Sequence, residues 1–147
     1  MKKKQKRRVF QKGASILMLA LGAAILLIAV LEIGGFGLMR TMLDVELGAR
    51  QLSELLMVLG IFNFVFSILS ITAGILGCLY ASKTAEKLQY CKKAGVWALI
   101  VLAMYGAFLV AVNAFATGVI LTTVITLMYL VSVFLNEKQQ KEAEVTV

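Results

Sequence analysis

The sequence predicts an all-α membrane protein whose four transmembrane helices form an antiparallel bundle with both termini in the cytoplasm. Three observations lead to this prediction. The 147 residues are 61% hydrophobic and 16% charged, whereas a soluble domain is roughly 45–50% apolar and about 25% charged. The apolar residues form long uncharged runs, and a helix needs about 20 such residues to cross a bilayer. The charged residues lie between these runs and at the two ends of the chain.

The first span is expected over residues 14–36, after a basic tail at residues 1–12. Its core from Ser15 to Leu31 carries no charge. Glycines near its end weaken the helix and mark its exit from the bilayer. Cleavage as a signal peptide is not expected, because the apolar run is too long and ends without a small-x-small pattern.

The second span is expected over residues 55–80. The polar stretch before it carries opposite charges four residues apart, as at Arg40 and Asp44. Such pairs support a helix, so this connection can itself be helical. A basic stretch, residues 82–93, follows the second span and separates it from the next apolar region.

The third and fourth spans are expected over residues 94–112 and 117–135. The apolar region that contains them is too long for one crossing and suits two. We place the turn between them at residues 113–118. The polar tail at residues 136–147 is expected to be disordered or frayed, and the whole chain, residues 1–147, forms one domain.

The distribution of basic residues predicts the orientation. Seven of the fifteen Lys and Arg residues lie among the first twelve residues, at Lys2, Lys3, Lys4, Lys6, Arg7, Arg8 and Lys12. With the N-terminus inside, thirteen basic residues lie on the cytoplasmic side and two lie outside, as the positive-inside rule requires. We expect the plasma membrane, and for so small a chain with a simple basic N-terminus the inner membrane of a bacterium. The basic cluster should face anionic lipid rather than nucleic acid.

One face of the second span carries only small or polar residues. They recur at alternating spacings of three and four residues, at Gly60, Asn63, Ser67, Ser70, Gly74, Gly77 and Ala81. We call this row the seam. Helices in a bilayer associate through small residues and hydrogen bonds. We therefore interpret the seam as a packing face, with Asn63, Ser67 and Ser70 donating hydrogen bonds across it. A polar lining for a solute path is the alternative.

Shorter rows of small residues occur on the last two spans. Ala103, Ala107 and Ala111 lie four residues apart on the third span, and Gly118, Thr122 and Thr126 do so on the fourth. This spacing places each row on one helix face. The two rows predict a tight contact between the third and fourth spans.

Glu32 is the one ionisable residue well inside an apolar run. It lies near the C-terminal end of the first predicted span, where the helix dipole disfavours a negative charge. Desolvation in lipid acts in the same direction. A proton-linked role for Glu32 is therefore one hypothesis. The alternative is that Glu32 reaches the headgroup region or pairs with Arg40 or Arg50.

The sequence offers little for catalysis or metal binding. It has no histidine, which is the commonest metal ligand and general base near neutral pH. Cys78 and Cys91 do not match any zinc spacing. No serine, histidine and aspartate set or glycine-rich phosphate loop is present. We expect no enzymatic activity, no cofactor and no metal ion.

The four-span plan resembles that of small uncharacterised four-span bacterial membrane proteins. Two motifs contribute to the resemblance, Gly74-Ile-Leu-Gly77 and the basic turn from Lys87 to Lys93 that leads into Gly95. The resemblance implies a bilayer protein and assigns no site residue.

Two functions fit the sequence. The first is a non-enzymatic membrane protein that acts through helix–helix contacts with another membrane protein or with itself, as an accessory, envelope-stress or immunity-type component. The second is a small oligomeric transporter or channel for ions or hydrophobic cations, in which Glu32 and Asn63 line the path.

Overall fold

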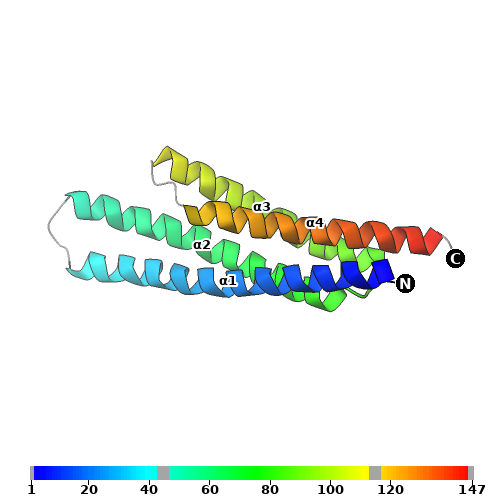
Figure 1. Cartoon of the computed structure of the whole chain (residues 1–147). Coiled ribbons are helices and arrows are strands. Elements are labelled where there is room, and N and C mark those ends of the chain that lie inside the picture. Colours follow the sequence, from blue (N-terminus) through cyan, green and yellow to red (C-terminus); the bar gives the residue numbers. More distant parts are fainter. Residues whose placement is uncertain (1, 43–46, 113–116, 146–147) are drawn as a thin grey trace.

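The computed structural model describes the backbone of residues 2–42, 47–112 and 117–145 and the side chains of residues 5–35, 54–112 and 117–142. The described chain forms four helices: α1 Lys2–Met42, α2 Leu47–Tyr80, α3 Ala85–Ala111 and α4 Thr117–Val145 (Figure 1). Each helix contains a segment that is long and apolar enough to cross a membrane. The predicted all-α fold with four potential spans is confirmed.

All four helices extend beyond the predicted spans. α1 runs from Lys2 to Met42, past the glycines expected to mark its end, α2 begins at Leu47, α3 begins at Ala85, and α4 continues to Val145. The expectation of a disordered or frayed tail is therefore wrong. The tail is rich in Glu, Lys and Gln, which favour helix, and Lys141 forms an ion pair of 2.8 Å with Glu137 one turn earlier. Of the predicted turn, residues 113–116 lie outside the described residues, and Thr117 and Gly118 belong to α4.

The two chain termini lie at the same end of the molecule, which we call the terminal end (Figure 1). The last turns of α1 and α3 lie at the opposite end. The main contacts join α1 to α2, α2 to α3, α3 to α4 and α4 to α1, and the contact between α1 and α2 is by far the most extensive.

All seven seam residues are buried, and the glycines among them lie against α1. A Cβ atom at Gly60 would lie 3.3 Å from Glu32 Cβ, and one at Gly74 would lie 2.7 Å from Leu19 Cβ. Because any larger side chain would collide with α1, these positions allow the two backbones to approach closely.

The seam serines differ from the expectation of hydrogen bonds between helices. Ser67 Oγ donates to the Phe64 carbonyl of its own helix at 2.7 Å. Ser70 Oγ is buried without a partner among the described residues. A serine hydroxyl in a helix readily reaches the carbonyl three or four residues earlier, which explains Ser67. Of the three predicted donors, Asn63 bonds to the neighbouring helix, at Glu32 Oε2.

The predicted contact between the small-residue rows of α3 and α4 is wrong. Ala103, Ala107 and Ala111 are exposed on the outer face of α3, and Gly118 has no neighbouring atom within 4 Å of an added Cβ. Thr122 and Thr126 instead turn into the bundle and are buried. The exposed faces meet the lipid in a membrane protein, so small residues there carry no information about the neighbouring helix. The α3–α4 contact uses Gly95, whose added Cβ would lie 2.7 Å from a methyl group of Leu130.

Large apolar side chains cover the outside of the bundle. Leu27 and Leu31 are 69% and 74% exposed, and Leu121 is 62% exposed. Such a surface would be unfavourable in water and suits the hydrocarbon core of a bilayer. Tyr90 is exposed in the second turn of α3, as expected for a side chain at a membrane–water interface, whereas the exposed Trp97 lies near the middle of that helix.

Candidate functional site

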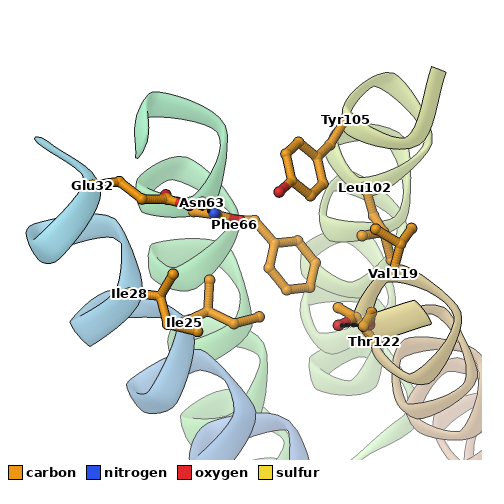
Figure 2. Close-up of a pocket in the computed structure, with 10 residues that line it drawn as sticks. Ile25, Ile28, Glu32, Asn63, Phe66, Leu102, Tyr105, Val119 and Thr122 are labelled. Atoms are coloured by element: carbon orange, nitrogen blue, oxygen red, sulfur yellow. Dashed lines mark hydrogen bonds between the residues drawn. The ribbon is translucent and has the colours of Figure 1, made fainter. Parts of the chain in front are cut away.

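A pocket of about 180 Å³ lies between the helices (Figure 2). It receives side chains from all four helices. Its lining consists of Ile25, Ile28, Glu32, Asn63, Phe66, Leu102, Tyr105, Gly118, Val119 and Thr122. Glu32 and Asn63 come from the two sequence features that were singled out independently, and the structure brings them together.

The Glu32 carboxyl group is held by the seam of α2. Asn63 Nδ2 donates a hydrogen bond of 2.8 Å to Glu32 Oε2. Gly60 lies one turn before Asn63 and has no side chain to keep α2 away from Glu32. The close packing of α1 and α2 therefore positions the carboxyl group, and the amide donor fixes its orientation.

Aromatic rings form the wall of the pocket opposite Glu32. The Tyr105 hydroxyl points across the gap toward Asn63 (Figure 2). The ring of Phe62 backs Tyr105 with a centroid separation of 5.8 Å. Phe66 is 3% exposed and its ring lies between the α1–α2 side and the α3–α4 side of the pocket. The faces of such rings carry partial negative charge and attract cations.

The remaining polar group of the pocket is Thr122. Its hydroxyl donates to the carbonyl of Gly118 at 2.8 Å, so its oxygen can still accept a hydrogen bond. The other lining residues are aliphatic, apart from Gly118. Lys and Arg do not occur among the described residues that line the pocket. The site therefore combines one carboxyl group, aromatic rings and an apolar wall.

The pocket lies more than one helical turn before the C-terminal ends of α1 and α3. Tyr105 precedes Ala111, the last residue of α3, by about 9 Å along the helix axis. α1 continues to Met42, so its C-terminal end lies about 15 Å beyond Glu32. The expected effect of the helix dipole on Glu32 is wrong, because that effect is confined to the last turn. The side chains of Arg40 and Arg50 lie outside the described residues.

The predicted basic cluster is described in part. The side chains of Lys2, Lys3 and Lys4 lie outside the described residues, and Lys6 is exposed. Arg7 donates to the carbonyl of Leu135 in α4 at 3.2 Å. Arg7 therefore contacts the bundle as well as providing charge.

A second polar cluster, at the terminal end, was missed by the sequence analysis. Gln11 and Asn136 are fully buried there and are hydrogen-bonded to each other. Tyr129 is also fully buried, and its hydroxyl lies 2.9 Å from the Ala73 carbonyl and 3.2 Å from the Cys91 carbonyl. Asn136 and Gln11 stand at the ends of apolar runs, where polar residues normally face water. Nothing in their spacing distinguishes them from headgroup contacts.

The pocket shows no sign of a metal centre. Within the part of the chain that the structure describes, groups of three or more His, Cys, Asp or Glu side chains that could hold a metal ion do not occur. Cys78 and Cys91 are free thiols, and Cys91 is buried.

Comparisons with protein-family models, curated proteins and solved structures gave no match. The four long apolar helices are consistent with an integral, multi-pass membrane protein.

Proposed function

We propose that the protein is a non-enzymatic membrane carrier that binds small organic cations with apolar substituents in the pocket at Glu32. It crosses the plasma membrane of a bacterium as an antiparallel four-helix bundle with both termini in the cytoplasm. The observation that supports this function is the Glu32 carboxyl group, hydrogen-bonded to Asn63, in a pocket with aromatic and aliphatic walls.

The chemistry of the pocket favours a cation with apolar substituents over other ligands. A carboxylate in a poorly solvated site attracts a positive charge much more strongly than it would in water. Phe66 and Tyr105 add ring faces suited to an ammonium group, and the aliphatic side chains favour alkyl substituents. A metal ion would require further oxygen ligands to replace its hydration shell, and the pocket has few.

The pocket offers little support for catalysis. It contains one carboxyl group and one phenol, without the paired nucleophile and base that acyl or phosphoryl transfer requires. Binding and release of a ligand need no such pair. We therefore propose transport rather than turnover of the ligand.

Binding of benzyltrimethylammonium to the detergent-purified chain tests this function. We expect saturable binding that falls at least tenfold in Glu32→Gln, because the amide keeps the acceptor for Asn63 but removes the charge. Glu86→Gln, which removes an equal charge at an exposed site on α3, should bind as well as the parent chain. Equal binding by both variants would contradict the proposal.

Liposomes separate transport from simple binding. Reconstituted protein should accelerate the exchange of radiolabelled benzyltrimethylammonium across the membrane, and Glu32→Gln should not. Binding without exchange would reduce the function to that of a receptor.

An introduced cysteine tests the orientation: in a chain with Cys78→Ser and Cys91→Ala, Val45→Cys should react with an impermeant maleimide from outside the cell.

A second candidate function, contact with another membrane protein, is supported by a different surface. The seam is occupied by α1 of the same chain, so it is not free for a partner. The exposed face of α3 and α4, however, has an apolar groove of about 570 Å³ that includes Ala103, Gly106 and Ala107. Small residues at such spacing admit a second helix at close range.

Filling this groove tests the second candidate. Ala103→Leu with Ala107→Leu should abolish co-purification of a specific membrane partner after gentle extraction. Ile100→Leu, which changes another exposed position of α3, should not. A chain that purifies as a monomer without a partner, with or without the substitutions, would contradict this function.

A further inference from the structure

The outer face of α3 near the terminal end carries a second open space, a groove of about 360 Å³. Its lining consists of Gln89, Lys92, Lys93, Val96, Trp97 and Ile100, and we call it the lysine groove. These residues recur at helical spacing, so they share one face of α3. None of these six residues lines the pocket at Glu32. Lys93 is exposed and Trp97 is 60% exposed, so the lysine groove opens onto the surroundings of the bundle.

The chemistry of the lysine groove changes along the helix. The half nearer the terminal end carries Gln89 and the two lysines, and the half beyond it carries Val96, Trp97 and Ile100. Because α3 begins at the terminal end (Figure 1), this order runs from polar to apolar toward the middle of the bundle. A molecule with an anionic group at one end and a hydrocarbon chain at the other matches this order.

The lysines make the polar half basic. Lys93 forms no ion pair among the described residues. Lys92 Nζ lies 3.7 Å from Glu137 Oε2 and 4.2 Å from the centroid of the Phe134 ring. An ion pair of that length is too long for a hydrogen bond, so the N–H donors of Lys92 remain available. Glu137 also pairs with Lys141 at 2.8 Å. Three lysines therefore share one carboxylate, and the excess charge attracts an anion.

The lysine groove lies where hydrocarbon gives way to headgroups. On α4 the apolar stretch over residues 117–135 is about 28 Å long, close to the thickness of a hydrocarbon core of about 30 Å. Its end is level with Lys92, because Lys92 contacts Phe134 and Glu137. The Cα atom of Trp97 lies about 7 Å farther into the bilayer. Helix side chains lean toward the N-terminus, so the indole reaches back toward the boundary.

Trp97 brings a polar group to this boundary. Its indole N–H is a donor, and it has no hydrogen-bond partner among the described residues. Hydrocarbon offers no acceptor, whereas the ester carbonyls of a phospholipid do, which is why tryptophan prefers the interface. The indole and the two lysines therefore call for the same kind of molecule.

We propose that the lysine groove binds one anionic phospholipid from the leaflet at the terminal end. Lys92 and Lys93 donate to its phosphate oxygens, and the indole N–H of Trp97 donates to an ester carbonyl. One acyl chain lies over Val96 and Ile100. A phospholipid with a choline headgroup binds more weakly, because the lysines repel its ammonium group. This site requires insertion of the bundle in a bilayer and does not depend on the function of the pocket at Glu32.

The single tryptophan of the chain allows a direct test. Bromine atoms on a phospholipid acyl chain quench indole fluorescence on contact, so quenching in vesicles that contain the full chain reports which lipid lies against Trp97. Mixtures of phosphatidylglycerol and phosphatidylcholine, with one or the other brominated, give their relative association constant. We expect phosphatidylglycerol to be favoured roughly fivefold. Lys92→Gln with Lys93→Gln should bring the ratio near one. Lys93→Gln alone, at an exposed position without an ion pair, should lower it about twofold.

Lys87→Gln is the matched control. Lys87 is exposed on the same helix but lies about 120° or more around it from Lys92 and Lys93, so the ratio should stay close to that of the parent chain. An equal loss in Lys87→Gln and Lys93→Gln would overturn the site in favour of diffuse charge attraction. Equal quenching by the two lipids in the parent chain would overturn the preference for an anionic headgroup. Weak quenching by both would show that protein, such as a second copy of the chain, covers Trp97, and would overturn lipid binding.

Discussion

The two ends of the helix bundle use similar polar side chains in opposite ways. At the pocket, Glu32, Asn63 and Tyr105 line a space of about 180 Å³. At the terminal end, Gln11, Asn136 and Tyr129 are fully buried and bond to each other or to helix carbonyls. Polar groups that face a cavity are free to meet a ligand, whereas polar groups that meet the protein fix helices in place. Packing, rather than residue type, therefore separates a ligand site from a structural contact between helices. We call the buried set of Gln11, Asn136 and Tyr129 the clamp.

Glycines determine which of the two situations arises. An added Cβ at Gly77 or at Gly95 would lie 2.9 Å from the Tyr129 ring, so the phenol fits between α2 and α3 because both side chains are missing. Gly118 at the pocket has no neighbouring atom within 4 Å of its added Cβ. The space beside Gly118 is therefore open, whereas the space beside Gly77 and Gly95 is filled by the Tyr129 ring.

The largest expected effect comes from filling the clamp. Gly77→Val would place a side chain against Ser15 and the Tyr129 ring. Overpacking of this kind costs about 3 kcal/mol when the surroundings cannot move, and both neighbours are fully buried. We expect the free energy of unfolding, measured in mixed detergent and dodecyl sulfate micelles, to fall by about that amount.

Gly118→Ala is the matched control at the other end. It meets open space and lies in the first turn of α4, so it should leave stability unchanged or raise it by about 0.5 kcal/mol. If Gly77→Val were tolerated as well as Gly118→Ala, the distinction between a filled and an unfilled end would be wrong.

The contrast between the two ends could be predicted from the sequence only in part. Three apolar runs, the last long enough for two crossings, predict four helices, and the alternating spacing of the seam places Asn63 and Gly60 on one face. Neither pattern says which helix the seam meets, so the contact of Glu32 with Asn63 appears only in the structure. For Ala103 and Ala107 the sequence predicted a helix contact that the structure does not have, because small residues at helical spacing occur on exposed faces as well as on contact faces. Burial of Asn136 depends on α4 meeting α1 beside the end of α2, which local patterns do not report.

A charge introduced into the clamp should also be costly. Asn136→Asp keeps the shape of the side chain but replaces the amide donor that serves Gln11 Oε1 and the Ala81 carbonyl. An acceptor would then face two acceptors at a fully buried position. We expect a loss of about 2 kcal/mol or more in the same unfolding assay. Asn136→Asp with parent stability would show that water reaches this layer.

Removal of one hydroxyl sharpens the comparison, because each end has a tyrosine. Tyr129→Phe loses a donor to buried helix carbonyls and should cost about 1 kcal/mol, within the range for hydrogen bonds between membrane helices. Tyr105→Phe removes a hydroxyl that faces the pocket and Asn63 and should cost about 0.5 kcal/mol, because the pocket has room for a water molecule that can bond to Asn63 in its place. Equal costs would indicate that Tyr105 is also part of a clamp.

The smallest expected effect on stability is that of Glu32→Gln. The glutamine amide oxygen still accepts from Asn63, whose Nδ2 lies 2.8 Å from the present carboxyl oxygen, and the pocket has room for the new amide group. We expect a change of less than about 0.5 kcal/mol in the free energy of unfolding, together with the loss of cation binding. A loss of cation binding without a loss of stability is what distinguishes a residue that binds a ligand from one that stabilises the fold. A loss of stability as large as that of Asn136→Asp would instead make Glu32 a structural partner of Asn63, and the pocket end would then be a second clamp.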